Sequence, residues 1–127
     1  MKKWMKGLLL FILVLIIGSV LVFYNLSENL KELMNEPVSA MNFDEIDDGN
    51  YEGEYGSFPV NAKVNVTVNN HEITQINILE HNHGKGAEGE KITDSIIEQQ
   101  TLEVDIISGA TYSSIVILKA VEDALIK

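Results

Sequence analysis

Hydrophobic residues fill one stretch near the start of the chain without a single charge. Residues 7–24 read GLLLFILVLIIGSVLVFY, and three lysines precede them, Lys2, Lys3 and Lys6. This length is close to the roughly 20 residues that a helix needs to cross a bilayer. The basic flank predicts a cytoplasmic N-terminus, so the remainder is expected outside the cytoplasm. A cleaved signal peptide is the alternative, but the exit VFYNLSEN offers no pair of small residues for cleavage, so we predict an uncleaved anchor.

The pattern becomes amphipathic after the anchor. Apolar residues recur at helical spacing and predict a stalk helix that ends at Pro37; they are Leu26, Leu30, Leu33 and Met34. A polar connector without a sustained period follows and ends in the turn composition DDGN. The predicted organisation is a basic end and anchor over residues 1–24, a stalk and linker over 25–47, and one domain over 48–127.

Strand patterns fill the first half of this domain. Residues 50–58, NYEGEYGSF, are typical of a strand broken by glycines, and residues 60–68, VNAKVNVTV, place an apolar side chain at every second position. Asn69 and Asn70 predict a hairpin turn because asparagine tolerates positive φ, and residues 72–80 return as a third strand.

Helical patterns fill the second half. Residues 81–89 are glycine-rich and predict a loop, residues 90–100 carry isoleucines on one helical face, and a closing helix is expected from about residue 113 to residue 126. Strands followed by helices predict an α+β fold, in which a small antiparallel, hairpin-based sheet packs with two helices behind the single N-terminal transmembrane helix.

Charge and composition exclude several classes of function. Residues from Asn25 onward hold 6 Lys and 19 Asp plus Glu, a net charge of −13, against −10 for the whole chain. Such a surface repels nucleic acid, which is therefore not expected as a partner. The chain has no cysteine, which excludes disulfides, iron–sulfur ligands and c-type haem attachment.

The stretch VDIISGATYSS places four small residues, two of them with hydroxyls, directly before the closing helix. The simpler interpretation is a tight turn in which Thr111 caps the helix. The alternative uses the same position, because the unpaired N–H groups at a helix N-terminus favour a phosphate on or near Thr111. Gly109 and Ala110 leave the backbone open to a modifying enzyme.

From about residue 49 to residue 127 the chain resembles the FMN-binding domain family. This domain is shared by the sodium-translocating NADH:quinone reductase, by the related ion-pumping Rnf complex and by many bacterial surface proteins. The resemblance is carried by DGNYEGEYG, by KVNVTVNNHEITQINILEHN and by VDIISGATYSSIVILKAVEDAL. The last stretch is similar to the flavinylation motif D-x-x-S-G-A-T, in which the threonine accepts FMN from FAD through a phosphoester bond made by a magnesium-dependent flavin transferase.

The resemblance implies roles for individual residues. Thr111 is expected to carry the flavin, Ser108, Gly109 and Ala110 to form the turn that the transferase recognises, and Asp105 to be the acidic position of the motif. His81 stands where family members often have histidine and is expected near the flavin or its phosphate.

The remaining candidates are weaker. A flavin ring needs apolar or aromatic surface, for which Tyr112, Tyr51, Tyr55 and Phe58 are candidates, although each is also explained by ordinary packing. His81 and His83, with His71, could form a metal site only with a further ligand. GKGAEGE, residues 84–90, matches no phosphate-binding loop motif and is explained as a surface loop, although the resemblance implies that it borders the flavin pocket. Ser113, Ser114 and His83 form no recognisable nucleophilic triad.

We therefore predict a membrane-anchored extracytoplasmic electron carrier with FMN on Thr111, which is not an enzyme by itself. Its expected partners are the flavin transferase and a membrane redox donor, such as a quinol- or NADH-linked complex. One alternative is a module that holds FMN noncovalently as a sensor or scavenger. Another is an anchored interaction domain in which Thr111 merely caps a helix.

Overall fold

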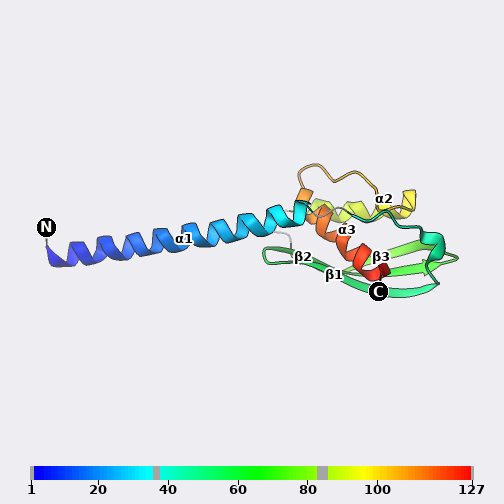
Figure 1. Cartoon of the computed structure of the whole chain (residues 1–127), viewed down its shortest axis with the longest axis horizontal. Helices are drawn as coiled ribbons and strands as arrows, with labels where there is room; N and C mark the ends of the chain where they lie inside the picture. The colour runs from blue at the N-terminus through cyan, green and yellow to red at the C-terminus, as the bar shows by residue number, and fades with distance from the viewer. Residues whose placement is uncertain (1, 36–37, 83–85, 127) are drawn as a thin grey trace.

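Three antiparallel strands form the base of the domain in the computed structural model, which describes residues 2–35, 38–82 and 86–126. They are β1 (Gly49–Ser57), β2 (Val60–Asn69) and β3 (Glu72–Asn82), in the order β1-β2-β3 (Figure 1). Asn70 and His71 have φ of 53° and 61° at the turn between β2 and β3. Asn70 and His71 therefore adopt the left-handed conformation that a two-residue hairpin requires. The tight turn is centred one residue later than the predicted Asn69–Asn70 pair.

The central strand β2 shows why the sheet has one buried face. Its valines and Ala62 alternate with partly exposed polar residues, so one face of the strand is buried along its whole length. Because successive side chains of a strand point to opposite faces, this alternation places every apolar residue of β2 under the helices. The predicted α+β fold with a three-stranded antiparallel sheet is confirmed.

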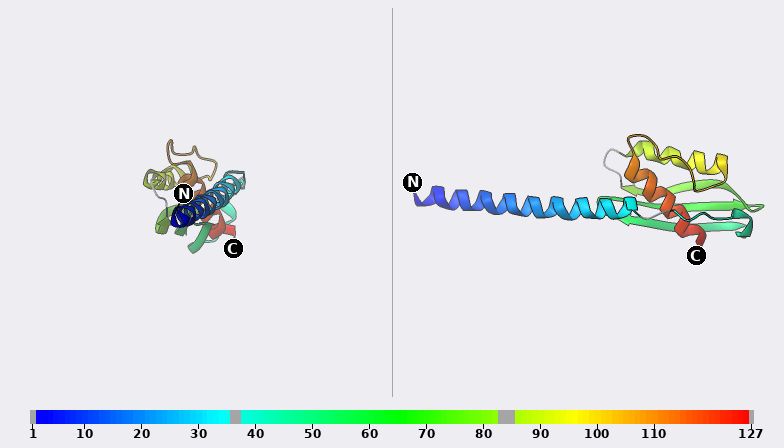
Figure 2. Two further views of the ribbon diagram at one scale, coloured as in Figure 1. Left: turned by 90° about the vertical axis from the view of Figure 1, so that its left-hand side faces the viewer. Right: turned by 45° about the horizontal axis from the view of Figure 1, so that its top comes forward.

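Two helices and a short 3-10 turn cover that face. They are η2 (Ala87–Lys91), α2 (Ile92–Gln99) and α3 (Thr111–Ile126), and Figures 1 and 2 show α2 and α3 on the same side of the sheet. A Cβ atom placed on Gly53 of β1 would lie 2.1 Å from the carbonyl oxygen of Ala120 in α3. The backbones of strand and helix are therefore in direct contact, and only glycine fits there.

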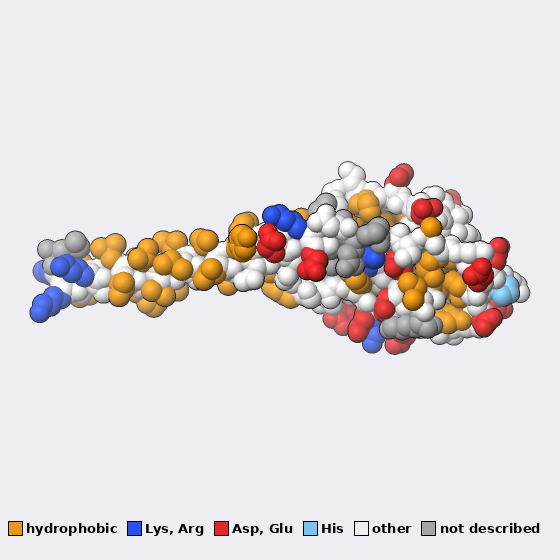
Figure 3. Space-filling view, in the orientation of Figure 1, with side chains coloured by type: hydrophobic (Ala, Val, Ile, Leu, Met, Phe, Trp, Pro, Cys, Tyr) orange, Lys and Arg blue, Asp and Glu red, His pale blue; other side chains and the backbone are white. Residues whose placement is uncertain are grey.

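The longest helix, α1 (Lys3–Asn35), projects from the domain (Figures 1 and 2). Its segment Lys3–Asn29 is long and apolar enough to cross a membrane and has no part buried within the protein. Hydrophobic side chains follow one another along α1 in the space-filling view, with lysines at its N-terminal end (Figure 3). Glu36 and Pro37, where this helix was expected to end, lie outside the described residues.

The connector after α1 is part of the folded domain. Phe43, in the short 3-10 helix η1 (Phe43–Glu45), and Ile46 are buried in the core, and Val38 and Met41 pack against it. The connector was expected to be a polar linker, but its spaced apolar residues cover one end of the small core.

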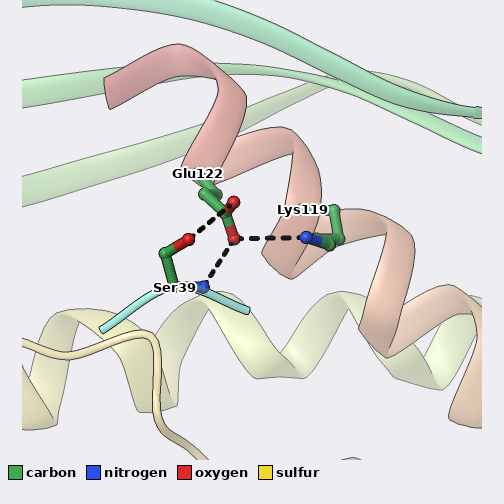
Figure 4. A network of polar contacts seen from close by, with 3 residues as sticks. All are labelled: Ser39, Lys119 and Glu122. Carbon is green, nitrogen blue, oxygen red and sulfur yellow. Dashed lines mark hydrogen bonds and ion pairs between the residues drawn. The ribbon is translucent and has the colours of Figure 1, made fainter. Parts of the chain in front are cut away.

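A polar network ties the connector to α3. The backbone N–H of Ser39 donates to Glu122 Oε2 at 3.0 Å, and the Ser39 hydroxyl donates to Oε1 at 3.3 Å. Lys119 Nζ lies 3.5 Å from the same Glu122 carboxylate, and both side chains are about nine-tenths buried (Figure 4). Lys119 also lies over the ring of Tyr55, 5.7 Å from its centre. Because a buried carboxylate needs partners for both oxygens, this connector network holds the chain after α1 against α3.

Candidate functional site

The motif turn enters α3 through one glycine in an unusual conformation. Gly109 has φ of +81°, and a Cβ atom placed there would meet nothing within 4 Å. Glycine is therefore needed for its backbone conformation and not for space. The N–H of Ala110 closes the turn by donating to the carbonyl of Ile107 at 3.0 Å.

A buried hydroxyl holds this turn against the helix. Ser114, which is fully buried, donates through Oγ to the carbonyl of Ala110 at 2.7 Å, and its Oγ accepts the N–H of Ile107 at 3.1 Å. One side chain thus satisfies a backbone donor and a backbone acceptor on the two sides of Ser108 and Gly109. These contacts make Ser114 a positioning residue for the motif.

Ser114 was missed as a functional residue by the sequence analysis, which considered it only as part of a nucleophilic triad. A signal was available in its spacing. It lies four residues after Ala110, so its side chain can reach back to that carbonyl within the first turn of the helix.

Thr111 is the first residue of α3, two residues before the predicted start of the helix. Across the described ranges its hydroxyl has no hydrogen-bond partner, so the expected capping role is not seen. The first amide bonded within the helix is that of Ser114, which donates to Ala110 at 2.9 Å. The N–H groups of residues 111–113 are thus the orphan donors of a helix N-terminus, and the helix dipole adds partial positive charge at this point.

An open hollow of about 200 Å³ lies against this helix end. Gly109, Ala110, Thr111, Tyr112 and Ser113 form one wall, and Val60 and Gly86 complete the lining. Gly86 belongs to the loop that the resemblance places at the border of the flavin pocket, whereas Val60 of β2 carried no sequence signal for this role. Gly89 brings η2 close to α3, since a Cβ atom there would lie 2.7 Å from Cβ of Ser113.

The structure brings only part of the predicted site together. Gly109, Ala110, Thr111 and Tyr112 all line the hollow, and Tyr112 also packs against the core. Asp105 and Ser108 are exposed in the loop before α3 and do not belong to the lining.

His81 lies at the end of β3 beside η2, and its expected position near the flavin stays a prediction. Its side chain is 2% exposed, and Nδ1 lies 3.0 Å from Glu90 Oε1, in the η2 segment. It is likewise absent from the lining of the hollow. His81 therefore connects the end of β3 to η2, whose Gly89 contacts the start of α3.

The other aromatic candidates lie at separate places. Tyr51 donates its hydroxyl to the carbonyl of Asp47 at 2.6 Å, and Tyr55 lines a different hollow beside Lys119. Phe58 is 76% exposed in the turn between β1 and β2, two residues before Val60. Of the four aromatic candidates, only Tyr112 lines the hollow at Thr111.

The histidines considered for a metal site are also separated. His71 donates through its Nδ1–H to the carbonyl of Ile46 at 2.7 Å, at the opposite end of β3 from His81. His83 lies outside the described residues. No group of three or more potential metal ligands occurs in the described part of the chain.

The comparisons with known proteins assign the family. The model of the FMN-binding domain family matches residues 57–126, which is more than half of the chain. The chain therefore belongs to the FMN-binding domain family, and its cofactor is FMN. No curated protein and no solved structure matches the chain.

The residues at the start of α3 fit the phosphate end of FMN. Three orphan amides and the helix dipole favour an anion beside Thr111, and Gly109 and Ala110 offer little steric obstruction. The hollow is smaller than the 300–1,000 Å³ typical of pockets that enclose a small-molecule ligand. A hollow of this size would enclose only part of a ligand as large as FMN.

Proposed function

We propose that this protein is a membrane-anchored, extracytoplasmic electron carrier in which FMN is esterified to Thr111. The observation that carries the proposal is the Thr111 hydroxyl, which stands without a hydrogen-bond partner in the described structure, at a helix N-terminus and beside an open hollow. Bound FMN supplies the redox chemistry, while the chain supplies position and access.

The shape of the site supports covalent attachment. A hollow of about 200 Å³ gives a bound flavin little enclosure, so noncovalent contacts alone would hold it weakly. In the proposed modification the Thr111 oxygen bonds to the FMN phosphorus of FAD, and the phosphoanhydride bond breaks. AMP and the hydroxyl proton leave. A flavin transferase is the proposed catalyst.

The proposed placement in the membrane rests on α1. Trp4 and Tyr24 are 20 positions apart, which corresponds to about 30 Å along a helix and to the thickness of the hydrocarbon core. Tryptophan and tyrosine favour the two membrane interfaces, and the lysines before the anchor favour the cytoplasmic side. The domain then lies outside the cytoplasm, where a tether prevents loss of the cofactor.

Flavin fluorescence after denaturing electrophoresis tests the covalent bond. The full chain is co-expressed with a flavin transferase as wild type, Thr111→Ala, Thr111→Ser and Thr74→Ala, the last changing an exposed threonine on β3. Fluorescence is expected in the wild type and Thr74→Ala, absent from Thr111→Ala, and retained to some degree in Thr111→Ser. Flavin that denaturation releases from the wild type supports the noncovalent sensor or scavenger instead, and a chain that never acquires flavin supports the interaction domain.

A further inference from the structure

A hydrogen bond between two side chains joins the end of β3 to η2. His81, the second-last residue of β3, donates through Nδ1–H to Glu90 Oε1 at 3.0 Å, since a carboxylate can only accept. The His81 side chain is 2% exposed, whereas the Glu90 side chain is 45% exposed. An acidic side chain on a surface segment thus turns inward to a buried imidazole. The His81–Glu90 pair therefore fixes η2 to the end of β3.

The same short segment forms part of the proposed flavin site. Gly86, directly before η2, lines the hollow at Thr111, and the N–H of Gly89 donates to the carbonyl of Gly86 at 2.9 Å. Gly89 in turn lies against α3, where an added Cβ atom would lie 2.7 Å from Cβ of Ser113 and 3.1 Å from the backbone nitrogen of Ser114. Figures 1 and 2 show the beginning of α2, which follows η2, beside the beginning of α3. The position of η2 therefore sets how the hollow is closed on the side of Gly86.

The short length of η2 makes its position depend on contacts with other elements. It is a 3-10 turn of five residues, and the hydrogen bonds within such turns have poor geometry. Its close contact with α3 is made by Gly89, which contributes only backbone atoms. The bond from His81 adds direction to this contact. Because its acceptor is a carboxylate and its donor is buried, the bond is stronger than one between neutral groups in water.

A second acid in the same turn shows that the pairing does not follow from charge alone. Glu88 forms an ion pair with Lys91 three residues later, and both side chains are 67% exposed. Such local pairs in solvent contribute little to stability and join no separate elements. Glu88 and Glu90 thus carry the same charge on the same turn, but in the described structure it is Glu90 that reaches another element of the fold.

We propose that the His81–Glu90 pair positions the flavin: it keeps the η2 side of the hollow against the start of α3, so that FMN on Thr111 is held between them. This inference rests on the proposed function. The pair acts through Gly86 and Gly89 and takes no part in forming the phosphoester bond. Its loss therefore leaves attachment to Thr111 intact but frees the attached flavin to move.

The rotational freedom of the attached flavin tests this proposal. The full chain is loaded by co-expression with a flavin transferase, purified in detergent and studied by time-resolved fluorescence anisotropy at a temperature where circular dichroism shows it to be folded. Glu90→Ala removes the acceptor, and Glu90→Gln keeps an acceptor oxygen without the charge. Glu88→Ala is the control that removes an equal charge from the same turn. His81→Ala removes the donor, and where this buried substitution prevents folding the surface substitution Glu90→Ala still provides the test.

The flavin is expected to rotate with the whole particle in the wild type and in Glu88→Ala. In Glu90→Ala and in His81→Ala, a separate motion on the nanosecond timescale or faster should account for about threefold more of the anisotropy decay. Glu90→Gln should lie closer to the wild type, and the double substitution should behave like either single one, because each removes the same bond. Without FMN, the amides of residues 86–91 should exchange hydrogen about tenfold faster in Glu90→Ala and within about twofold of the wild type in Glu88→Ala.

Three outcomes would contradict this account. A loaded Glu90→Ala chain whose flavin rotates as in the wild type overturns the positioning role and leaves the carrier function intact. Equal mobility in Glu88→Ala and Glu90→Ala does the same, since the lost charge alone then explains the change. A wild type that never acquires flavin overturns both the carrier function and the positioning role.

Discussion

Ser114→Ala is the substitution that most specifically loosens the motif turn without touching Thr111. It removes the hydroxyl that donates to Ala110 at 2.7 Å and accepts from Ile107 at 3.1 Å, in a fully buried position. Ala110 keeps its bond from the Ser114 amide, but the Ile107 N–H loses its partner. An unsatisfied buried donor costs about 1–3 kcal/mol, so we expect a loss of about 2 kcal/mol in the free energy of unfolding.

Thermal unfolding of the full chain in detergent, followed by circular dichroism, measures this loss. For a domain of this size about 2 kcal/mol lowers Tm by roughly 8–16 °C. Ser113→Ala is the matched control for stability, because Ser113 is also buried but its hydroxyl makes no hydrogen bond within the described ranges. We expect its effect to remain within about 0.5 kcal/mol. Equal effects of the two substitutions would refute the assignment of Ser114.

The same variant separates positioning from attachment. Ser114→Ala retains the acceptor hydroxyl, so it should still acquire flavin from FAD and the transferase, but several-fold more slowly at a temperature where the domain remains folded. A time course of intact mass measures the rate. A wild-type rate in a variant with lowered Tm would show that Ser114 stabilises the fold without presenting Thr111.

Three further substitutions test contacts elsewhere in the domain. Gly53→Ala should destabilise the domain by about 3 kcal/mol or more in urea denaturation. The new Cβ atom would lie 2.1 Å from a backbone atom of Ala120 and 2.3 Å from one of Ala124. Gly18→Ala is the control and should have little effect, because a Cβ atom at Gly18 meets nothing within 4 Å. Gln100→Ala removes the side-chain hydrogen bonds to the Ile73 N–H, the Ile73 carbonyl and the Ile97 carbonyl. The Ile73 amide should therefore exchange its hydrogen faster, and the free energy of unfolding should fall by about 2 kcal/mol. Unchanged exchange at Ile73 would show that Gln100 does not protect this amide. The backbone N–H groups of His71 and Asn70 hold the pKa of Asp48 below its ordinary value of 3.8, so its contribution to stability is present above pH 3.8 and is lost as the pH falls through the lowered folded-state pKa. Asp48→Asn should therefore weaken the loss of stability below pH 3.8, and an unchanged pH profile of unfolding would contradict the assignment.

The periodic parts of the fold could be predicted from the sequence because their patterns depend on neighbouring residues alone. The alternation in β2 identified a buried face that the structure confirms, and the closing helix was placed to within two residues of α3. The connector was harder to predict, because Phe43 and Ile46 are isolated in a polar segment. Only the folded domain shows that they close one end of the core.

The site could be predicted only where the chemistry is local. The motif placed Gly109, Ala110 and Thr111 together because they are consecutive. The resemblance placed the loop that contains Gly86 beside the pocket, but the contribution of Val60 depends on how β2 meets the start of α3. His81 was expected at the cofactor, but its pairing with Glu90 depends on the path of the chain after β3.

Intact mass spectrometry of the full chain tests the central claim most directly. After co-expression with a flavin transferase that is active on a known acceptor, the wild type should gain the mass of one FMN less one water. Fragmentation should place the gain on Thr111, and Thr111→Ala should lack it. A wild type of unmodified mass, or a gain that persists in Thr111→Ala, would contradict the claim that Thr111 carries the flavin.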